Sequence, residues 1–303
     1  MKGERRLICC LPENNQLRDL FDLEGVARKT ERSGMRYDRL RGMDLEMSVM
    51  PRLAAGQRIL SLGIRFSRTP DIARMASGAG YDLVWIDLEH SSMSIDAAAQ
   101  IAATAHDIGL GAWVRVPERE YGVIGRLLDS GGTGIIGPKI ETEADARLLA
   151  GACRFPPLGQ RSMLARLPQT GFVRTGADEF VATANNSVVV QALIESPRGI
   201  ENADAIAAVL GIDIIGVGTN DLTAEMGCPG KVRNAAVMEA CAHVASVARA
   251  HGKVAIIGGV ADDDHFLELL EMGFSPFIFA GIDTDVVADG LVQRVDSWRG
   301  KFA

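Results

Sequence analysis

Short runs of β-branched and other apolar residues alternate along this chain with longer amphipathic segments that are rich in alanine and leucine. Such alternation is typical of strand–helix units repeated around a parallel sheet. The pattern predicts eight strands, at residues 59–64, 83–87, 112–116, 134–138, 188–195, 212–218, 254–258 and 276–280. It predicts helices most clearly at residues 95–107, 142–153, 200–210, 235–250 and 262–272. Eight strands favour a closed ring over an open sheet, so the predicted fold is α/β, a (β/α)8 TIM barrel.

Two segments depart from this pattern. Residues 1–51 show little apolar periodicity, and we interpret them as an N-terminal extension of unknown role before a barrel domain at residues 52–303. Four methionines in the extension leave a later translation start as an alternative: Met35, Met43, Met47 and Met50. The second segment, residues 155–176, is rich in proline, glycine and arginine and joins the fourth and fifth strands. Long loops at the strand-end face of a barrel are commonly functional.

Composition restricts the class of partner. The 303 residues are 47% hydrophobic and 23% charged, which is ordinary for a globular protein with one large core. A formal net charge of -7 argues against a nucleic-acid or anionic-membrane surface and favours small molecules. Five cysteines without C-x-x-C spacing do not indicate a disulfide framework or a zinc cage. Because no apolar run is long enough to span a bilayer or form a signal-peptide core, a cytoplasmic location is expected.

Acidic side chains stand where predicted strands end. Asp87 closes the second strand, Glu195 the fifth, and Asp221 follows the sixth. Because neighbouring strands lie about 4.8 Å apart, the carboxylates of Glu195 and Asp221 can reach one divalent cation. Two carboxylates leave coordination positions for water and substrate, as Mg²⁺ or Mn²⁺ sites do and a closed zinc site does not. The alternative is that both acids serve ordinary caps or ion pairs.

Anion-binding groups are predicted on the same face. Gly218, Thr219 and Asn220 have a turn-prone composition before a helix start, where free backbone N–H groups bind a carboxylate or a phosphate. Arg115 ends the third strand and can clamp an oxyanion that develops during a reaction. A surface ion pair is the more frequent role of a strand-end arginine.

One histidine and one lysine are candidates for proton transfer or covalent chemistry. His90 is the candidate general base, because an imidazole ordinarily titrates near neutrality and Asp87, three residues earlier, can orient the ring. A structural role is the alternative for a lone histidine. Lys139, at the end of the fourth strand, is the one candidate for a Schiff-base amine, although a salt bridge is its commoner role.

Four motifs, at residues 86–90, 114–117, 194–195 and 218–227, agree in order and spacing with a known family. From about residue 52 to near the C-terminus the chain resembles the metal-dependent class II pyruvate aldolases of the HpcH/HpaI type. The resemblance implies that Glu195 and Asp221 hold a divalent metal ion, Mg²⁺, Mn²⁺ or Co²⁺. It also implies roles for the remaining site residues: His90 as base, Asp87 as its partner, Arg115 at the enolate, and Gly218, Thr219 and Asn220 at the substrate carboxylate.

The resemblance further implies an activity and an assembly. The activity is reversible cleavage of a 4-hydroxy-2-oxo acid into pyruvate, or a close keto acid, and an aldehyde, through a metal-stabilised enolate. The implied partners are therefore the small-molecule 2-oxo acid and the aldehyde, in agreement with the net charge, which argues against a nucleic acid or a membrane. The assembly is a homo-oligomer, a hexamer, in which a C-terminal helix around Asp285 to Trp298 packs on a neighbouring subunit.

Departures from the family pattern keep other functions open. Leu88 stands where the family commonly has glycine, and Leu193 stands where it has glutamine. Residues 138–141 and 194–200 look similar to the citrate lyase β-subunit branch of the same superfamily. The alternatives are an acyl-CoA lyase, an oxaloacetate decarboxylase, or a non-catalytic barrel that binds a keto acid.

Overall fold

The computed structural model describes residues 49–164, 166–167, 172, 176–260 and 262–301. The chain divides into two units, Met1–Gly42 and Met43–Ala303, and every described residue belongs to the second. Residues 1–48 of the predicted extension and part of the 155–176 segment lie outside the described residues. The predicted boundary after residue 51 falls inside the first described helix, α3 (Val49–Ala54).

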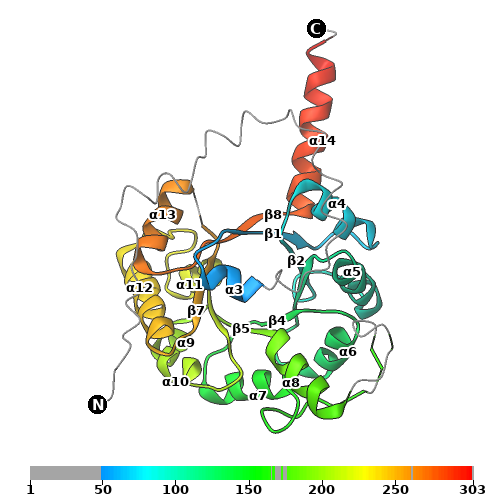
Figure 1. Ribbon diagram of the computed structural model, residues 1–303. Coiled ribbons are helices and arrows are strands. Elements are labelled where there is room, and N and C mark those ends of the chain that lie inside the picture. The colour runs from blue at the N-terminus through cyan, green and yellow to red at the C-terminus, as the bar shows by residue number, and fades with distance from the viewer. Residues whose placement is uncertain (1–48, 165, 168–171, 173–175, 261, 302–303) are drawn as a thin grey trace, which may run out of the picture. The chain divides into compact units, whose positions relative to one another are not determined.

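Eight parallel strands follow one another around a ring, in the order β7-β6-β5-β4-β3-β2-β1-β8. Their bounds are β1 Ile59–Ile64, β2 Leu83–Asp87, β3 Gly111–Arg115, β4 Gly134–Gly137, β5 Val189–Ile194, β6 Ile214–Gly218, β7 Val254–Gly258 and β8 Phe277–Ile282. At the seam between β7 and β8 the Phe279 ring fills the space beside Gly258, where a Cβ would lie 3.5 Å from it. The predicted TIM barrel is confirmed, as a nearly closed ring (Figure 1).

Helices surround the ring of strands (Figure 1). Their bounds are α4 Asp71–Ala79, α5 Ile95–Asp107, η3 Tyr121–Val123, α6 Ile124–Asp129, α7 Glu143–Cys153, α8 Ala177–Ser187, α9 Pro197–Glu201, α10 Ala203–Ala207, α11 Thr219–Glu225, α12 Ala235–Ala250, α13 Asp263–Met272 and α14 Asp283–Arg299. The predicted caps are present, because the Ser94 side chain accepts from the N–H of Ala97 and Thr142 forms a capping box with Asp145. Where one helix was predicted at residues 200–210, two short helices, α9 and α10, meet at Asn202.

The barrel interior is filled by aromatic rings, and glycines on neighbouring strands make room for them. A Cβ on Gly63 would lie 2.6 Å from the Trp85 ring, and one on Gly134 would lie 2.5 Å from the Trp113 ring. Trp113 stacks on Phe277 with 5.2 Å between ring centroids. Because alternate strand residues point inward, the residues two positions beyond the tryptophans, Asp87 and Arg115, reach the C-terminal mouth of the barrel.

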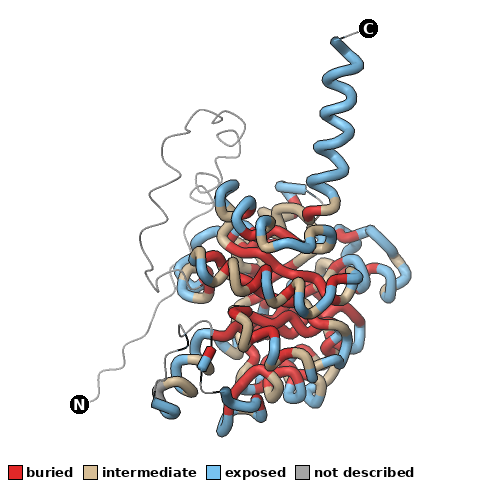
Figure 2. Tube along the Cα trace, turned by 90° about the vertical axis from the view of Figure 1, so that its right-hand side faces the viewer, coloured by how far each residue is buried: buried red, intermediate tan, exposed pale blue. Residues whose placement is uncertain are grey.

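The two ends of the described chain behave differently. Val49 and Leu53 of α3 are buried in the interior cluster, so α3 covers the N-terminal opening of the barrel (Figure 1). In contrast, α14 extends away from the strands and is exposed along nearly its whole length (Figure 2). No helix in the described part of the chain is both long and apolar enough to cross a membrane.

Candidate active site

On one side of the barrel mouth, the side chains of Arg65 and Arg115 both bind Asp87. Strands β2 and β3 are in register at Asp87 and Arg115, so the two side chains leave adjacent strands at the same level. The buried carboxylate accepts from Arg115 Nε at 3.0 Å and Nη2 at 2.6 Å, a two-point ion pair, and from Arg65 Nε at 2.6 Å. Burial alone would raise the pKa of Asp87, but the hydrogen bonds and charge of Arg115, aided by Arg65, hold that pKa below its usual range.

Arg115 links Asp87 to the next acidic residue. Its Nη1 lies 3.1 Å from Glu89 Oε2, and its guanidinium lies 5.2 Å from the centroid of the Trp85 ring. Burial acts to lower the pKa of Arg115, but the hydrogen bonds and charge of Asp87 outweigh it, so that pKa is raised. The side chain is 11% exposed, and its charge is therefore held at one position on the rim.

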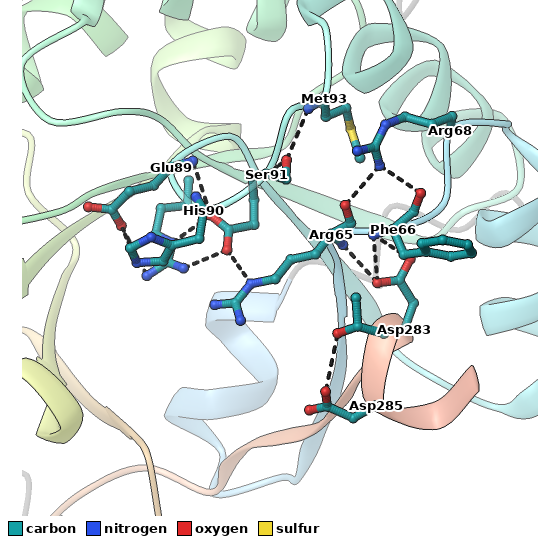
Figure 3. Close-up of polar contacts among 12 residues, drawn as sticks. Arg65, Phe66, Arg68, Glu89, His90, Ser91, Met93, Asp283 and Asp285 are labelled. Atoms are coloured by element: carbon teal, nitrogen blue, oxygen red, sulfur yellow. Dashed lines mark hydrogen bonds and ion pairs between the residues drawn. The ribbon is translucent and has the colours of Figure 1, made fainter. Parts of the chain in front are cut away.

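His90 lies at the outer edge of this cluster. Its ring Nε2 is 3.5 Å from Glu89 Oε2, and its side chain is 52% exposed (Figure 3). We expected Asp87 to orient this ring, but the Asp87 carboxylate instead accepts from the backbone N–H of His90 at 3.2 Å and from the two arginines. The reason is strand register, which faces Asp87 toward Arg115, while the turn after β2 carries the imidazole outward.

Arg65, which the sequence analysis did not select, completes the cluster. It follows β1 directly and extends toward the side of the mouth where Glu89 and His90 lie (Figure 3). In the register between β1 and β2, Ile64 pairs with Ile86. The next residue on each strand is Arg65 and Asp87, so these two lie side by side. A sequence signal could have identified it: Ile59, Ser61 and Gly63 alternate toward the barrel interior, and Arg65 is the next residue in that series.

The loop after β1 is held by the carboxylate of Asp283, which is distant in the sequence, and by the guanidinium of Arg68 at the end of the loop itself. Asp283 accepts from the backbone N–H groups of Arg65 at 2.8 Å, Phe66 at 3.0 Å and Ser67 at 2.7 Å. Arg68 Nη1 donates to the backbone carbonyls of the same three residues, and Figure 3 shows its bonds to Arg65 and Phe66. Burial would raise the pKa of Asp283, but these N–H groups keep it low. The backbone that carries Arg65 is therefore fixed.

Glu195 lies on the other side of the mouth. The residue is 4% exposed, and its carboxylate accepts from the backbone N–H of Lys139 at 2.9 Å. Burial raises the pKa of Glu195 to about 7, and the negative charges of Glu89 and Asp221 act in the same direction. A Cβ on Gly218, the next position on β6, would lie 2.7 Å from Glu195 Oε2. Glycine at that position therefore gives the carboxylate its space.

Asp221 belongs to the first turn of α11, which begins immediately after β6. Thr219 is buried, and its hydroxyl donates to the carbonyls of Gly258 at 2.9 Å and Gly259 at 3.0 Å. These bonds tie the start of α11 to the end of β7. The predicted carboxylate-binding residues, Gly218, Thr219 and Asn220, thus form the strand-to-helix turn next to Glu195.

The departures from the family pattern have defined positions. Leu88 is buried, and its N–H donates to the carbonyl of Arg115. Leu193 faces the barrel interior two residues before Glu195, and Gln191 lies one further layer down, against Gly216. Gln191 therefore does not take the place that glutamine has in the family pattern. Lys139 lies 3.8 Å from Glu118, the salt bridge expected of it.

Glu195 and Asp221 supply negatively charged oxygen donors of the kind that divalent cations bind. Within the described ranges, no group of three or more His, Cys, Asp or Glu side chains is arranged to hold a metal ion. Burial is the main cause of the raised pKa of Glu195, and the carboxylates of Glu89 and Asp221 lie close enough for their charges to raise it further. Hard oxygen donors that repel one another suit a hard cation, and two of them leave positions open for substrate.

Comparison with known proteins identifies the family of the chain. The HpcH/HpaI aldolase/citrate lyase family matches residues 66–289. The chain is 38% identical over 217 residues to a 4-hydroxy-4-methyl-2-oxoglutarate aldolase of Chaetomium globosum, covering 70% of this chain and 80% of the relative. It is 34% identical to a 4-hydroxy-2-oxovalerate aldolase of Novosphingobium aromaticivorans, covering 77% and 88%.

The fold comparison points the same way. The crystal structure of an HpcH/HpaI aldolase from Desulfitobacterium hafniense superposes with a TM-score of 0.76 at 25% identity. The superposition covers 83% of this chain and 96% of that chain. The family match, the two relatives and the shared fold together show that this chain belongs to the HpcH/HpaI aldolase/citrate lyase family.

Proposed function

We propose that this protein is a metal-dependent class II aldolase that reversibly cleaves a 4-hydroxy-2-oxo acid into pyruvate, or a close keto acid, and an aldehyde. The observation that carries the proposal is the arrangement of charges at the mouth. The buried carboxylate of Glu195 and the exposed carboxylate of Asp221 share the rim with the fixed guanidinium of Arg115 and the half-exposed imidazole of His90. The relatives reported above are aldolases, which favours aldol cleavage over the acyl-CoA lyase, decarboxylase and non-catalytic alternatives.

The proposed cofactor is a divalent metal ion, Mg²⁺, Mn²⁺ or Co²⁺, held by Glu195 and Asp221. When bound, such an ion polarises the substrate ketone and stabilises negative charge on its oxygen. The backbone N–H groups of Gly218, Thr219 and Asn220 would bind the substrate carboxylate beside it. Glycine at position 218 supports this arrangement, because it leaves the Glu195 carboxylate room at the turn.

Protein groups on the opposite rim would handle charge and protons. Arg115 would donate to the oxygen of the enolate as it forms, since its position is fixed by two bonds to Asp87. His90 would remove the proton of the C4 hydroxyl group during cleavage and return it during synthesis. Asp87 then contributes by holding Arg115 rather than by orienting the imidazole. Glu89, 3.1 Å from Arg115 and 3.5 Å from His90, connects the two groups.

The proposed assembly is a homo-oligomer, with a hexamer expected from the family resemblance. The support is α14, which carries six exposed large apolar residues: Val286, Val287, Leu291, Val292, Val295 and Trp298. Such a helix has few contacts within its own barrel (Figure 2) and is typical of an intersubunit contact. Sedimentation as a monomer would contradict the assembly. The cytoplasmic location stays a prediction.

The function is tested by pyruvate release from a panel of 4-hydroxy-2-oxo acids with and without Mg²⁺, Mn²⁺ or Co²⁺. We expect cleavage of at least one acid, dependent on an added metal. Oxaloacetate and an acyl-CoA thioester in the same assay test the other two enzymatic functions. Turnover of none of these compounds, together with metal-dependent binding of pyruvate, would instead identify a non-catalytic barrel.

A further inference from the structure

Arg65 stands on the side of the mouth away from the proposed metal ligands. In the ring order, β1 is four strands from β5, which is half-way around a ring of eight. Glu195 follows β5 and Asp221 follows β6, whereas Arg65 follows β1 and His90 follows β2. A 4-hydroxy-2-oxo acid whose keto-acid end lies at Glu195 and Asp221 therefore extends its C4 end toward His90 and Arg65.

Arg65 has hydrogen-bond donors to spare. Its Nε donates to Asp87, but its two terminal amino groups have no protein partner among the residues that the structure describes. Asp87 does not depend on Arg65, because Arg115 already binds both of its carboxylate oxygens. The Arg65 side chain is 29% exposed, and its guanidinium lies 5.8 Å from the centroid of the Trp85 ring. A partly buried planar fork with free donors is suited to a carboxylate.

The position of this fork is preorganised. Asp283 and Arg68 fix the backbone N–H and carbonyl groups of residues 65–67, and Asp87 fixes Nε. An arginine needed only for solubility would not be held at both its backbone and its side chain. Preorganisation of this kind increases the selectivity of a binding group, because little ordering is left to occur when the ligand arrives.

We propose that Arg65 is a specificity-determining residue that binds a second carboxylate, attached at C4 of the substrate, so that the enzyme prefers 4-hydroxy-2-oxo dicarboxylates. This inference rests on the proposed aldolase function and names its substrate class. Of the two relatives, one is named for an oxoglutarate, a dicarboxylate, and the other for an oxovalerate, a monocarboxylate. Both kinds of substrate therefore occur among relatives, and Arg65 decides between them here.

The test compares two substrates with the same five-carbon chain, 4-hydroxy-2-oxoglutarate and 4-hydroxy-2-oxovalerate. They differ only in a carboxylate or a methyl group at C4. We expect the wild-type enzyme to have the higher kcat/KM for the dicarboxylate. Arg65→Gln should lower that kcat/KM by about 10²-fold, the usual effect of losing hydrogen bonds to a charged group, and change the oxovalerate value less than threefold. The Arg65→Lys variant should lie between the two enzymes.

The control variant is Arg147→Gln, which removes the same charge from an exposed ion pair on α7 and should change neither value. An equal fall for both substrates in Arg65→Gln would show that Arg65 only supports Asp87, and would overturn the proposal. So would a wild-type preference for the oxovalerate. If the wild-type enzyme cleaves another acid of the panel but neither of these two, the proposal for Arg65 fails; if it cleaves no acid of the panel with any metal, the aldolase function itself fails. Thermal unfolding of each variant confirms that it is folded.

Discussion

The two halves of the barrel mouth hold buried carboxylates in opposite electrostatic environments. On the β1–β3 half, Asp87 is bound by the guanidinium groups of Arg115 and Arg65, and its pKa is held below the usual range. On the β5–β6 half, Glu195 is also buried, but the charges of Glu89 and Asp221 help burial to raise its pKa to about 7. Burial acts to raise both pKa values; at Asp87 the two arginines outweigh it, and at Glu195 the hydrogen bond from Lys139 and the charge of Arg115 do not.

The difference indicates that the two halves of the mouth have different roles. The β1–β3 half has its charges paired within the protein and can therefore present fixed donors to a substrate. The β5–β6 half has an excess of oxygen donors and suits a cation from solution. Aldol cleavage needs both, a metal-binding side for the keto acid and a side that handles the proton and the forming oxyanion.

The largest effect is expected from Asp221→Ala, which removes one of the two proposed metal ligands on the β5–β6 half. We expect loss of metal binding and of all aldol cleavage, because a single remaining carboxylate is a poor ligand set. Isothermal titration with Mn²⁺ and the pyruvate assay measure the two effects. Asp264→Ala, at an exposed acid on α13, is the control. Full activity of the Asp221 variant, or of wild type in excess EDTA, would refute the metal site.

Removal of the proposed base tests the other half. His90→Ala should lower kcat by about 10²–10⁴-fold, the usual contribution of a positioned acid–base group. Metal and pyruvate affinity should stay nearly unchanged, because the imidazole lies on the side away from Glu195. His243→Ala, on the exposed face of α12, is the control. Near-normal cleavage by the His90 variant would assign that residue a structural role.

Arg115→Lys tests whether the paired half needs a guanidinium rather than a positive charge. A lysine cannot bind both Asp87 oxygens and a substrate oxygen together. We expect kcat/KM to fall by about 10²–10³-fold, as when a donor to a forming oxyanion is lost. Proton exchange at the methyl group of bound pyruvate, followed by NMR in D₂O, should fall with it. An unchanged exchange rate would place Arg115 outside the enolate step.

The smallest expected effect is on stability. Asp283→Asn should lower the free energy of unfolding by about 1.5–3 kcal/mol at pH 7, because three N–H groups then bond a neutral amide. The lowered pKa of Asp283 means that its contribution is complete above an ordinary carboxyl pKa of about 3.9 and is lost as pH falls further. The gap to wild type in urea unfolding should therefore narrow in acid. Asp285→Asn, exposed on the same helix, is the control; an equal effect there would contradict the prediction.

The fold could be predicted closely because its signals are local. Strands β1, β2 and β7 begin and end where the apolar runs do, and helices α5 and α12 match their predicted bounds. The helix predicted at residues 200–210 was wrong in one detail, since Asn202 separates two short helices. The hydrophobic period shows that a segment is helical over several turns but does not show a break at a single residue.

The site was only partly predictable. Asp87 and Arg115 were recognisable because each ends an apolar strand, and the strand register brings them together. Arg65 and Asp283 were missed because each looks unremarkable locally, one in a polar loop and one at a helix start. They are 218 residues apart, and only closure of the barrel between β8 and β1 places Asp283 under the loop that carries Arg65.

Substrate reaches a rim whose loop after β1 is already ordered. Fixing one residue's backbone costs roughly 1–2 kcal/mol of conformational entropy. At residues 65–67 this ordering occurs when the chain folds, so it does not reduce the free energy of substrate binding. Association of a dicarboxylate at Arg65 should then be governed by diffusion and desolvation, without a slow closing step. The contacts with the Arg65 guanidinium would then lengthen the lifetime of a dicarboxylate relative to a monocarboxylate, so selectivity should be expressed in the dissociation rate.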